Sequence, residues 1–129
     1  MTDPQTETPF YQLGGQETMR AIVNRFYDLM ESDPAYAELR AMHARDLAPM
    51  RESLAGFLTG WAGGPRDWFE RNPGKCMMSA HAQFAITPAV AAQWADAMRR
   101  AIADVAPANA PVAARIGDVL KQMTEQMAR

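Results

Sequence analysis

The sequence has very few of the side chains from which proteins build disulfides and metal sites. Its 129 residues include one cysteine and two histidines. A single cysteine cannot form an internal disulfide, and these three side chains are too few for a structural zinc site, which takes four nitrogen or sulfur ligands. Any metal in this chain must therefore use very few protein ligands, or arrive in a cofactor that supplies its own.

Neither an excess of basic charge nor a long apolar run is present. Thirteen Lys and Arg oppose fifteen Asp and Glu, and the basic residues are scattered, whereas nucleic-acid sites cluster them. No apolar run approaches the ~20 residues of a membrane-spanning helix, and the first residues lack the basic and apolar regions of a signal peptide. We therefore expect no nucleic-acid or membrane partner, and a cytoplasmic location.

The common catalytic motifs are missing as well. The sequence contains no G-x-S-x-G elbow, no phosphate-binding glycine loop, no H-E-x-x-H and no C-x-x-C. Cys76 and His81 are five residues apart, which puts them roughly 140° apart around a helix, so they are not expected to form a catalytic pair.

What the sequence does have is helical periodicity. Apolar residues recur at three- and four-residue spacing in four segments, and no segment alternates with the period of a strand. The pattern predicts an all-α fold with helices crossing at large angles, as in globins, rather than four straight parallel rods. The four stripes are Met19, Ile22, Val23, Phe26, Tyr27 and Met30; Leu47, Met50, Leu54, Phe57, Leu58 and Trp61; Val90, Trp94, Met98, Ile102 and Val105; and Val112, Ile116, Val119, Leu120, Met123 and Met127.

Proline and glycine mark the predicted boundaries. Thr8-Pro9 and Thr87-Pro88 each place a capping hydroxyl before a proline, which is typical of a helix start. Glycine pairs at 14–15 and 63–64 predict breaks between helices. The stretch around Trp68 is predicted to be irregular, residues 76–82 a short helix and 106–111 a linker. We expect a disordered tail over residues 1–8 and a single domain over residues 9–129.

One histidine suggests a cofactor. His81 is either an ordinary hydrogen-bonded imidazole or the axial ligand of a haem iron, the metal cofactor that needs only one protein ligand. Tyr27 and Trp94 lie on apolar stripes, where a buried hydroxyl or indole N–H must find a partner. They are either core aromatics bonded to the backbone or, together with His43, donors around one small polar ligand.

The order and spacing of several segments resemble the second group of the truncated haemoglobins. Trp94 stands where that group carries a tryptophan, and the resemblance covers most of the chain, residues 10–102. The resembling segments are 10–15 (FYQLGG), 25–30 (RFYDLM), 39–47 (LRAMHARDL), 57–65 (FLTGWAGGP) and 81–86 (HAQFAI).

The resemblance implies a truncated, two-over-two helical sandwich around a b-type haem, with His81 as the proximal iron ligand. The distal side chains that it implies are Tyr27, Trp94, His43, Met50 and Leu54. The porphyrin contacts that it implies are Phe57, Met77 and Phe84.

The sequence departs from the family where the haem propionates are held. Ser53 and Ala80 replace the usual basic partners, and the family's Gly-His-Pro segment before the proximal helix is absent. We expect Lys75 and Arg51 to serve as propionate cations, with Trp68 as a neutral donor.

Three donors around one site favour slow ligand release. The sequence therefore predicts a haem protein, five-coordinate or reversibly six-coordinate, that binds O2, CO or NO. We expect oxygen or NO chemistry, as a nitric oxide dioxygenase or peroxidase-like enzyme with a reductase partner, rather than bulk oxygen transport, and a monomer or weak homodimer. The alternatives are a six-coordinate redox or gas sensor, with His43 or Tyr27 on the iron, and a haem-free helical interaction module.

Overall fold

The computed structural model describes residues 8–73, 86–105 and 110–127, and these contain helices and no strand. The helices in chain order are α1 (Pro9–Leu13), α2 (Gly15–Ser32), the 3₁₀ turn η2 (Pro34–Tyr36), α3 (Ala37–Ala41), α4 (Ala48–Trp61), α5 (Asp67–Arg71), α7 (Pro88–Val105) and α8 (Ala110–Met127). The predicted all-α class is confirmed. Within these ranges, no helix has the length and apolar character needed to cross a membrane.

The four long helices coincide with the four predicted stripes, but three details differ. The stretch around Trp68 is a five-residue helix, α5, rather than irregular. Helix α8 begins at Ala110, inside the predicted linker. Val119 of α8 and Met50 of α4 are 39% and 38% exposed, so these two residues do not belong to the buried part of their stripes. Residues 1–7 of the predicted tail over residues 1–8 and the predicted helix over residues 76–82 lie outside the described residues.

The two Thr-Pro starts behave differently. Thr87 caps α7 as predicted, because its Oγ1 accepts a hydrogen bond of 3.1 Å from the backbone N–H of Val90. Thr8 makes no side-chain cap on α1. Its hydroxyl donates instead to the carbonyl of Gly63, at 3.2 Å, and so ties the start of α1 to the end of α4.

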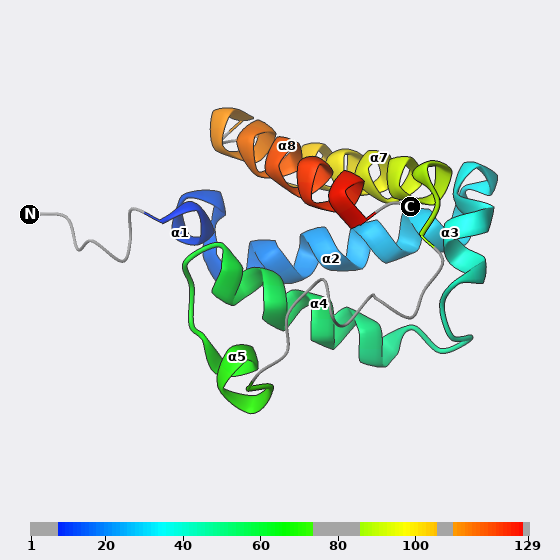
Figure 1. Cartoon of the computed structure of the whole chain (residues 1–129). Coiled ribbons are helices and arrows are strands. Elements are labelled where there is room, and N and C mark those ends of the chain that lie inside the picture. Colours follow the sequence, from blue (N-terminus) through cyan, green and yellow to red (C-terminus); the bar gives the residue numbers. More distant parts are fainter. Residues whose placement is uncertain (1–7, 74–85, 106–109, 128–129) are drawn as a thin grey trace, which may run out of the picture.

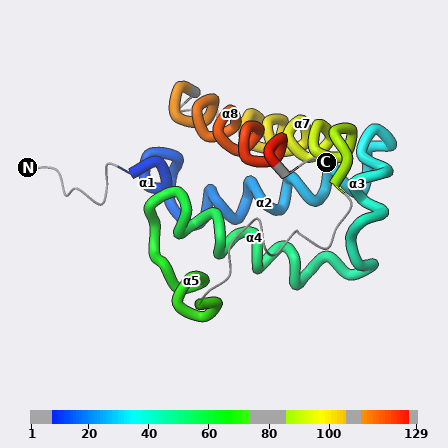
Figure 2. Tube along the Cα trace, viewed as in Figure 1, coloured from blue at the N-terminus to red at the C-terminus, as the bar shows by residue number. Residues whose placement is uncertain are grey.

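The long helices form two layers, which Figures 1 and 2 show from one side. Helix α2 is central: it packs against α7 on one side and against α4 on the other. Helices α7 and α8 pack against each other, and α5 folds back onto α4. The pair α2 and α4 thus lies over the pair α7 and α8, which is the two-over-two arrangement that the resemblance implies.

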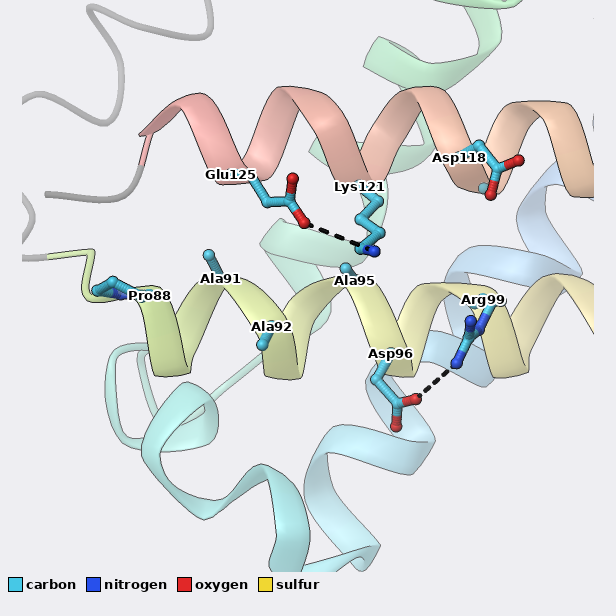
Figure 3. A pocket seen from close by; sticks show the side chains of 10 residues that line it. Pro88, Ala91, Ala92, Ala95, Asp96, Arg99, Asp118, Lys121 and Glu125 are labelled. Atoms are coloured by element: carbon cyan, nitrogen blue, oxygen red, sulfur yellow. Dashed lines mark hydrogen bonds and ion pairs between the residues drawn. The ribbon is translucent and has the colours of Figure 1, made fainter.

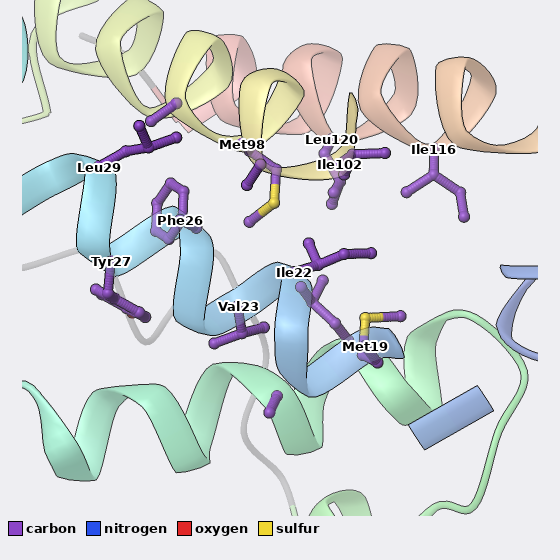
Figure 4. Close-up of a cluster of buried hydrophobic side chains, with 14 of the residues drawn as sticks. Met19, Ile22, Val23, Phe26, Tyr27, Leu29, Met98, Ile102, Ile116 and Leu120 are labelled. Atoms are coloured by element: carbon purple, nitrogen blue, oxygen red, sulfur yellow. The ribbon is translucent and has the colours of Figure 1, made fainter. Parts of the chain in front are cut away.

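The core is built on the two faces of α2. Ile22, Phe26 and Leu29 point toward α7, whereas Val23 and Tyr27 point toward α4 (Figure 4). All five are almost completely buried, and full burial of a large apolar side chain contributes about 1.5–3 kcal/mol. The apolar stripe of α2 therefore holds both layers together, and it places Tyr27 on the side that faces α4.

The second glycine pair ends α4 and positions α1. Gly63 has a φ of +98°, a conformation that side chains other than glycine rarely adopt. The turn lets the backbone N–H of Phe10 donate to the carbonyl of Ala62 at 2.9 Å. Phe10 is buried against the rest of the core, so the short first helix closes one end of the molecule.

Candidate ligand-binding site

Tyr27 is the polar side chain most deeply set between α2 and α4. It is 2% exposed, and its ring meets Phe26 and His43 edge to face, with ring centroids 5.0 and 6.0 Å away. Burial raises the pKa of the phenol to about 12, partly offset by the positive charge of Arg51. The hydroxyl is therefore neutral near pH 7 and is available as a donor. Among the described residues, no hydrogen bond of this hydroxyl is found.

His43 lies at the corner between α3 and α4, beside the Tyr27 ring. Its Nδ1 is 2.9 Å from the carbonyl oxygen of Leu39. A carbonyl oxygen only accepts, so Nδ1 carries the hydrogen, and the neutral imidazole then has its lone pair on Nε2. This hydrogen bond and the edge-to-face contact with Tyr27 hold the imidazole beside the phenol ring. Its predicted part in a set of three donors stays a prediction.

Trp94 reaches the same region from α7. Its half-buried indole meets the Phe26 ring at a centroid distance of 5.3 Å. Phe26 therefore contacts both Tyr27 and Trp94, and the three rings form one aromatic group across α2 and α7. Within the ranges that the structure describes, the indole N–H has no hydrogen-bond acceptor. Tyr27 and Trp94 thus supply two unused donors close to one buried ring.

Arg51 is directed toward α2. Its guanidinium donates to the carbonyl oxygen of Asn24, to Asp28 and to Glu31, at 3.0, 2.9 and 3.1 Å. It also lies over the face of the Tyr27 ring, 5.6 Å from its centroid. In this structure the guanidinium is therefore bound to side chains and backbone of α2. The predicted contact of Arg51 with a haem propionate stays a prediction.

The outer part of α4 carries the predicted apolar contacts. Met50 is 38% exposed, Leu54 is half-buried and Phe57 is buried. The Phe57 ring meets Trp68 of α5 at 5.5 Å. The indole N–H of Trp68 donates to the hydroxyl of Ser53 at 3.3 Å, so the predicted neutral propionate donor already has an acceptor on α4.

Four predicted haem contacts, namely His81, Met77, Phe84 and Lys75, lie outside the described residues. The proximal ligand therefore stays a prediction. No group of three or more His, Cys, Asp and Glu that could hold a metal ion occurs in ranges 8–73, 86–105 and 110–127.

The chemistry of the described side chains fits the distal side of a haem site. Such a site needs neutral donors for a small ligand and apolar side chains for the porphyrin. Tyr27 and Trp94 provide the donors. Met50 and Leu54 keep apolar area exposed on α4, the helix that Tyr27 faces.

A surface groove elsewhere takes no part in this site. It encloses about 670 Å³ between α7 and α8 and is lined by alanines such as Ala91, Ala92 and Ala95 (Figure 3). Four of its five charged side chains form ion pairs, Lys121 with Glu125 and Arg99 with Asp96. None of the predicted site residues lines it.

Sequence reasoning missed the roles of two residues. Phe26 was assigned to the core stripe, and that pattern does not distinguish a core ring from one that contacts two donors. Phe69 packs on Phe57 at 5.5 Å, but it lies on a helix too short to show periodicity.

Comparison with known proteins gives consistent matches. The family model described as bacterial-like globin matches residues 8–129. A group II 2-on-2 haemoglobin from Agrobacterium tumefaciens is 30% identical, with a TM-score of 0.92 over 100% of this chain and 98% of that one. A cold-adapted truncated haemoglobin from Pseudoalteromonas haloplanktis is 29% identical, with a TM-score of 0.90 over 95% and 98% of the two chains. A haemoglobin from Chloroflexus aurantiacus is 30% identical, with a TM-score of 0.84 over 95% and 98%.

Proposed function

Because this chain belongs to the bacterial-like globin family, we propose that it binds haem through His81 and holds small diatomic ligands beside Tyr27, Trp94 and His43. Its predicted resemblance to the second group of truncated haemoglobins is confirmed by the group II structure that it matches over its whole length. Globins are haem proteins, so haem b is the cofactor, and the alternative of a haem-free interaction module is wrong. When bound, the haem supplies an iron that takes up O2, CO or NO.

The observation that carries the proposal is the unused hydroxyl of Tyr27. A neutral phenol that is largely removed from water is a strong donor to a ligand that gains negative charge on binding. A hydrogen bond to a charged acceptor is worth about 1.5–3 kcal/mol, and each 1.4 kcal/mol is tenfold in an equilibrium constant. Tyr27 alone would therefore slow ligand release by roughly ten- to a hundredfold.

Slow release favours chemistry on the ligand over its delivery. We infer nitric oxide dioxygenation or a peroxidase-like reaction, with electrons from a reductase, rather than bulk oxygen transport. Tyr27 and Trp94 would stabilise the charge that develops on the ligand, and Met50 and Leu54 would exclude water. A cytoplasmic location and the oligomeric state stay predictions.

A second candidate, a six-coordinate redox or gas sensor, is favoured by one observation. The hydrogen bond between Nδ1 of His43 and the carbonyl oxygen of Leu39 orients the imidazole beside the Tyr27 ring. A backbone carbonyl orients many metal-ligating histidines in this way. This candidate predicts low-spin absorption bands in the protein without added ligand, and their loss in His43→Ala.

Tyr27→Phe tests the donor role most simply. Removing the hydroxyl should speed oxygen dissociation by roughly ten- to a hundredfold, because the ring stays and only the hydrogen bond is lost. Stopped-flow mixing of the oxygenated protein with CO measures the rate. Tyr11→Phe is the control, because Tyr11 lies on α1 with its ring exposed. An unchanged oxygen dissociation rate in Tyr27→Phe overturns the donor role.

A further inference from the structure

Arg51 makes a set of contacts that the proposed function does not yet use. Its guanidinium is held on α2 by the carbonyl and side chain of Asn24, by Asp28 and by Glu31. At the same time it lies over the face of the Tyr27 ring, 5.6 Å from its centroid. The side chain is 23% exposed, less than the arginines of the other described ion pairs.

The three anchors flank Tyr27 along the helix. Residues 24, 28 and 31 follow the spacing i, i+4 and i+7, so they line one side of α2 next to Tyr27. The planar guanidinium can bond several acceptors at once, which fixes its orientation better than a single contact would. The arginine therefore has a defined place over the ring, and it limits the movements open to the ring.

The positive charge of Arg51 affects the electrons of the Tyr27 phenol as well as the position of its ring. A cation over an aromatic face is attracted by the electrons of the ring and draws them away from the hydroxyl. The hydroxyl then becomes a better donor, in agreement with the lowering effect of Arg51 on the Tyr27 pKa. Asp28 and Glu31 bring negative charge, but both are largely exposed to water, which screens them more than the half-buried guanidinium.

We propose that Arg51 is a positioning residue for ligand binding, which clamps the Tyr27 ring and strengthens its hydroxyl as a donor to the bound gas. The proposal rests on the proposed function, because it needs Tyr27 to be the donor. Arg51, on α4, would then act on the ligand through Tyr27 of α2, without having to touch the ligand or the haem.

A double-mutant cycle on the haem-loaded protein tests it. Arg51→Met should speed oxygen dissociation by roughly two- to tenfold. In the Tyr27→Phe background the same change should alter the rate by less than about twofold, since the effect passes through the hydroxyl. Arg51→Lys, which keeps the charge without the planar fork, should lie between Arg51→Met and the parent protein.

The control removes a different ion pair between the same two helices. Arg20 of α2 pairs with Glu52 of α4 at 2.9 Å, away from Tyr27. Arg20→Met should leave oxygen dissociation within about twofold of the parent rate, because exposed ion pairs contribute little to stability. If Arg20→Met has the effect of Arg51→Met, loosening of α2 against α4 explains both and the proposal is wrong.

The C–O stretching frequency of the CO complex gives a readout that a purely structural brace would not move. A weaker positive field at the ligand raises this frequency, so Arg51→Met should raise it when Tyr27 is present and leave it unchanged with Tyr27→Phe. Equal effects of Arg51→Met in both backgrounds, or no effect in either, overturn the role of Arg51.

If Tyr27→Phe itself changes neither the rate nor the frequency, it is the proposed function of Tyr27 that fails. If Arg51→Met does not fold, Arg51→Lys in both backgrounds decides in the same way.

Discussion

At the scale of the residue, Tyr27 combines a buried ring with a hydroxyl that has no hydrogen-bond partner among the described residues. It is buried deeply enough to hold its proton far above the usual range, with a pKa of about 12. Its hydroxyl makes no hydrogen bond within the part of the chain that the structure describes. Because no fully buried side-chain nitrogen or oxygen there lacks a partner, the hydroxyl oxygen is not sealed off from open space. These two properties are the basis of our proposal that a bound ligand accepts a hydrogen bond from Tyr27.

The raised pKa predicts how stability depends on alkaline pH. The unfolded chain loses the Tyr27 proton near pH 10, whereas the folded protein holds it to about pH 12. Between these values the folded state binds more protons than the unfolded state, so the free energy of unfolding falls as pH rises. Tyr27 contributes a slope of at most about 1.4 kcal/mol per pH unit to the free energy of unfolding. Well below pH 10 it contributes no pH dependence, because it is protonated in both states.

Urea unfolding of the haem-loaded protein at several pH values from about 9 to 11 measures this slope. Tyr27→Phe should flatten it. Burial and Asp96 raise the pKa of Tyr36 too, but Tyr36 is present in both proteins, so its contribution cancels in the comparison. Equal slopes in the two proteins would show that Tyr27 ionises in the folded state as easily as in water.

Single residues also show where sequence reasoning ends. The stripes and the family resemblance predicted that Tyr27, Trp94 and His43 belong to one site, and the structure places Tyr27 beside His43 and links it to Trp94 through Phe26. The proton position on His43 depends on the carbonyl of Leu39, which no sequence motif encodes. The partners of Arg51 depend on how α4 packs against α2, which helical periodicity alone does not fix.

At the scale of the element, glycine in α4 sets the distance to α5. A Cβ added to Gly56 would lie 2.9 Å from the Trp68 ring, and one added to Gly60 would lie 2.5 Å from the Phe69 ring. The two glycines are four residues apart and so lie on one face of the helix. Their lack of side chains lets the aromatic pair of α5 rest on α4 and contact Phe57.

Two glycine-to-alanine changes should therefore act in opposite directions. Gly60→Ala should destabilise the protein by about 1–3 kcal/mol, because the new methyl group overlaps Phe69. Gly117→Ala in α8 should stabilise it by about 0.5–1 kcal/mol, because alanine favours the helix and its Cβ would meet nothing within 4 Å. Thermal unfolding of the two haem-loaded variants measures the difference, and a loss of stability in Gly117→Ala of the same size as in Gly60→Ala would contradict it.

Length decided which elements the sequence could predict. The long helices α2, α4, α7 and α8 span several turns each, so their apolar periodicity is sufficient to predict them from sequence. Helix α5 has five residues, which is too short for a period to show, and its formation depends on contacts with α4. The predicted linker runs to Pro111, but α8 starts at Ala110, because proline is tolerated in the first turn of a helix.

At the scale of the whole molecule, the two layers have different roles. Helices α7 and α8 bury the core side of α2, which fixes its rotation. The opposite side of α2 then presents Tyr27 to α4, where Arg51 meets it. The fold could be predicted from sequence because the order of motifs matches a known family along most of the chain. The predicted proximal ligand, His81, lies outside the described residues.

The most direct measurement is the absorption spectrum of the purified, haem-loaded protein and of His81→Ala, before and after dithionite and CO. The account predicts a Soret band that shifts on reduction and again with CO, with haem retained by the parent protein and lost by His81→Ala. Low-spin bands without added ligand would favour the six-coordinate form. A parent protein that stays colourless after mixing with haemin, or a His81→Ala variant with unchanged spectra, would contradict the account.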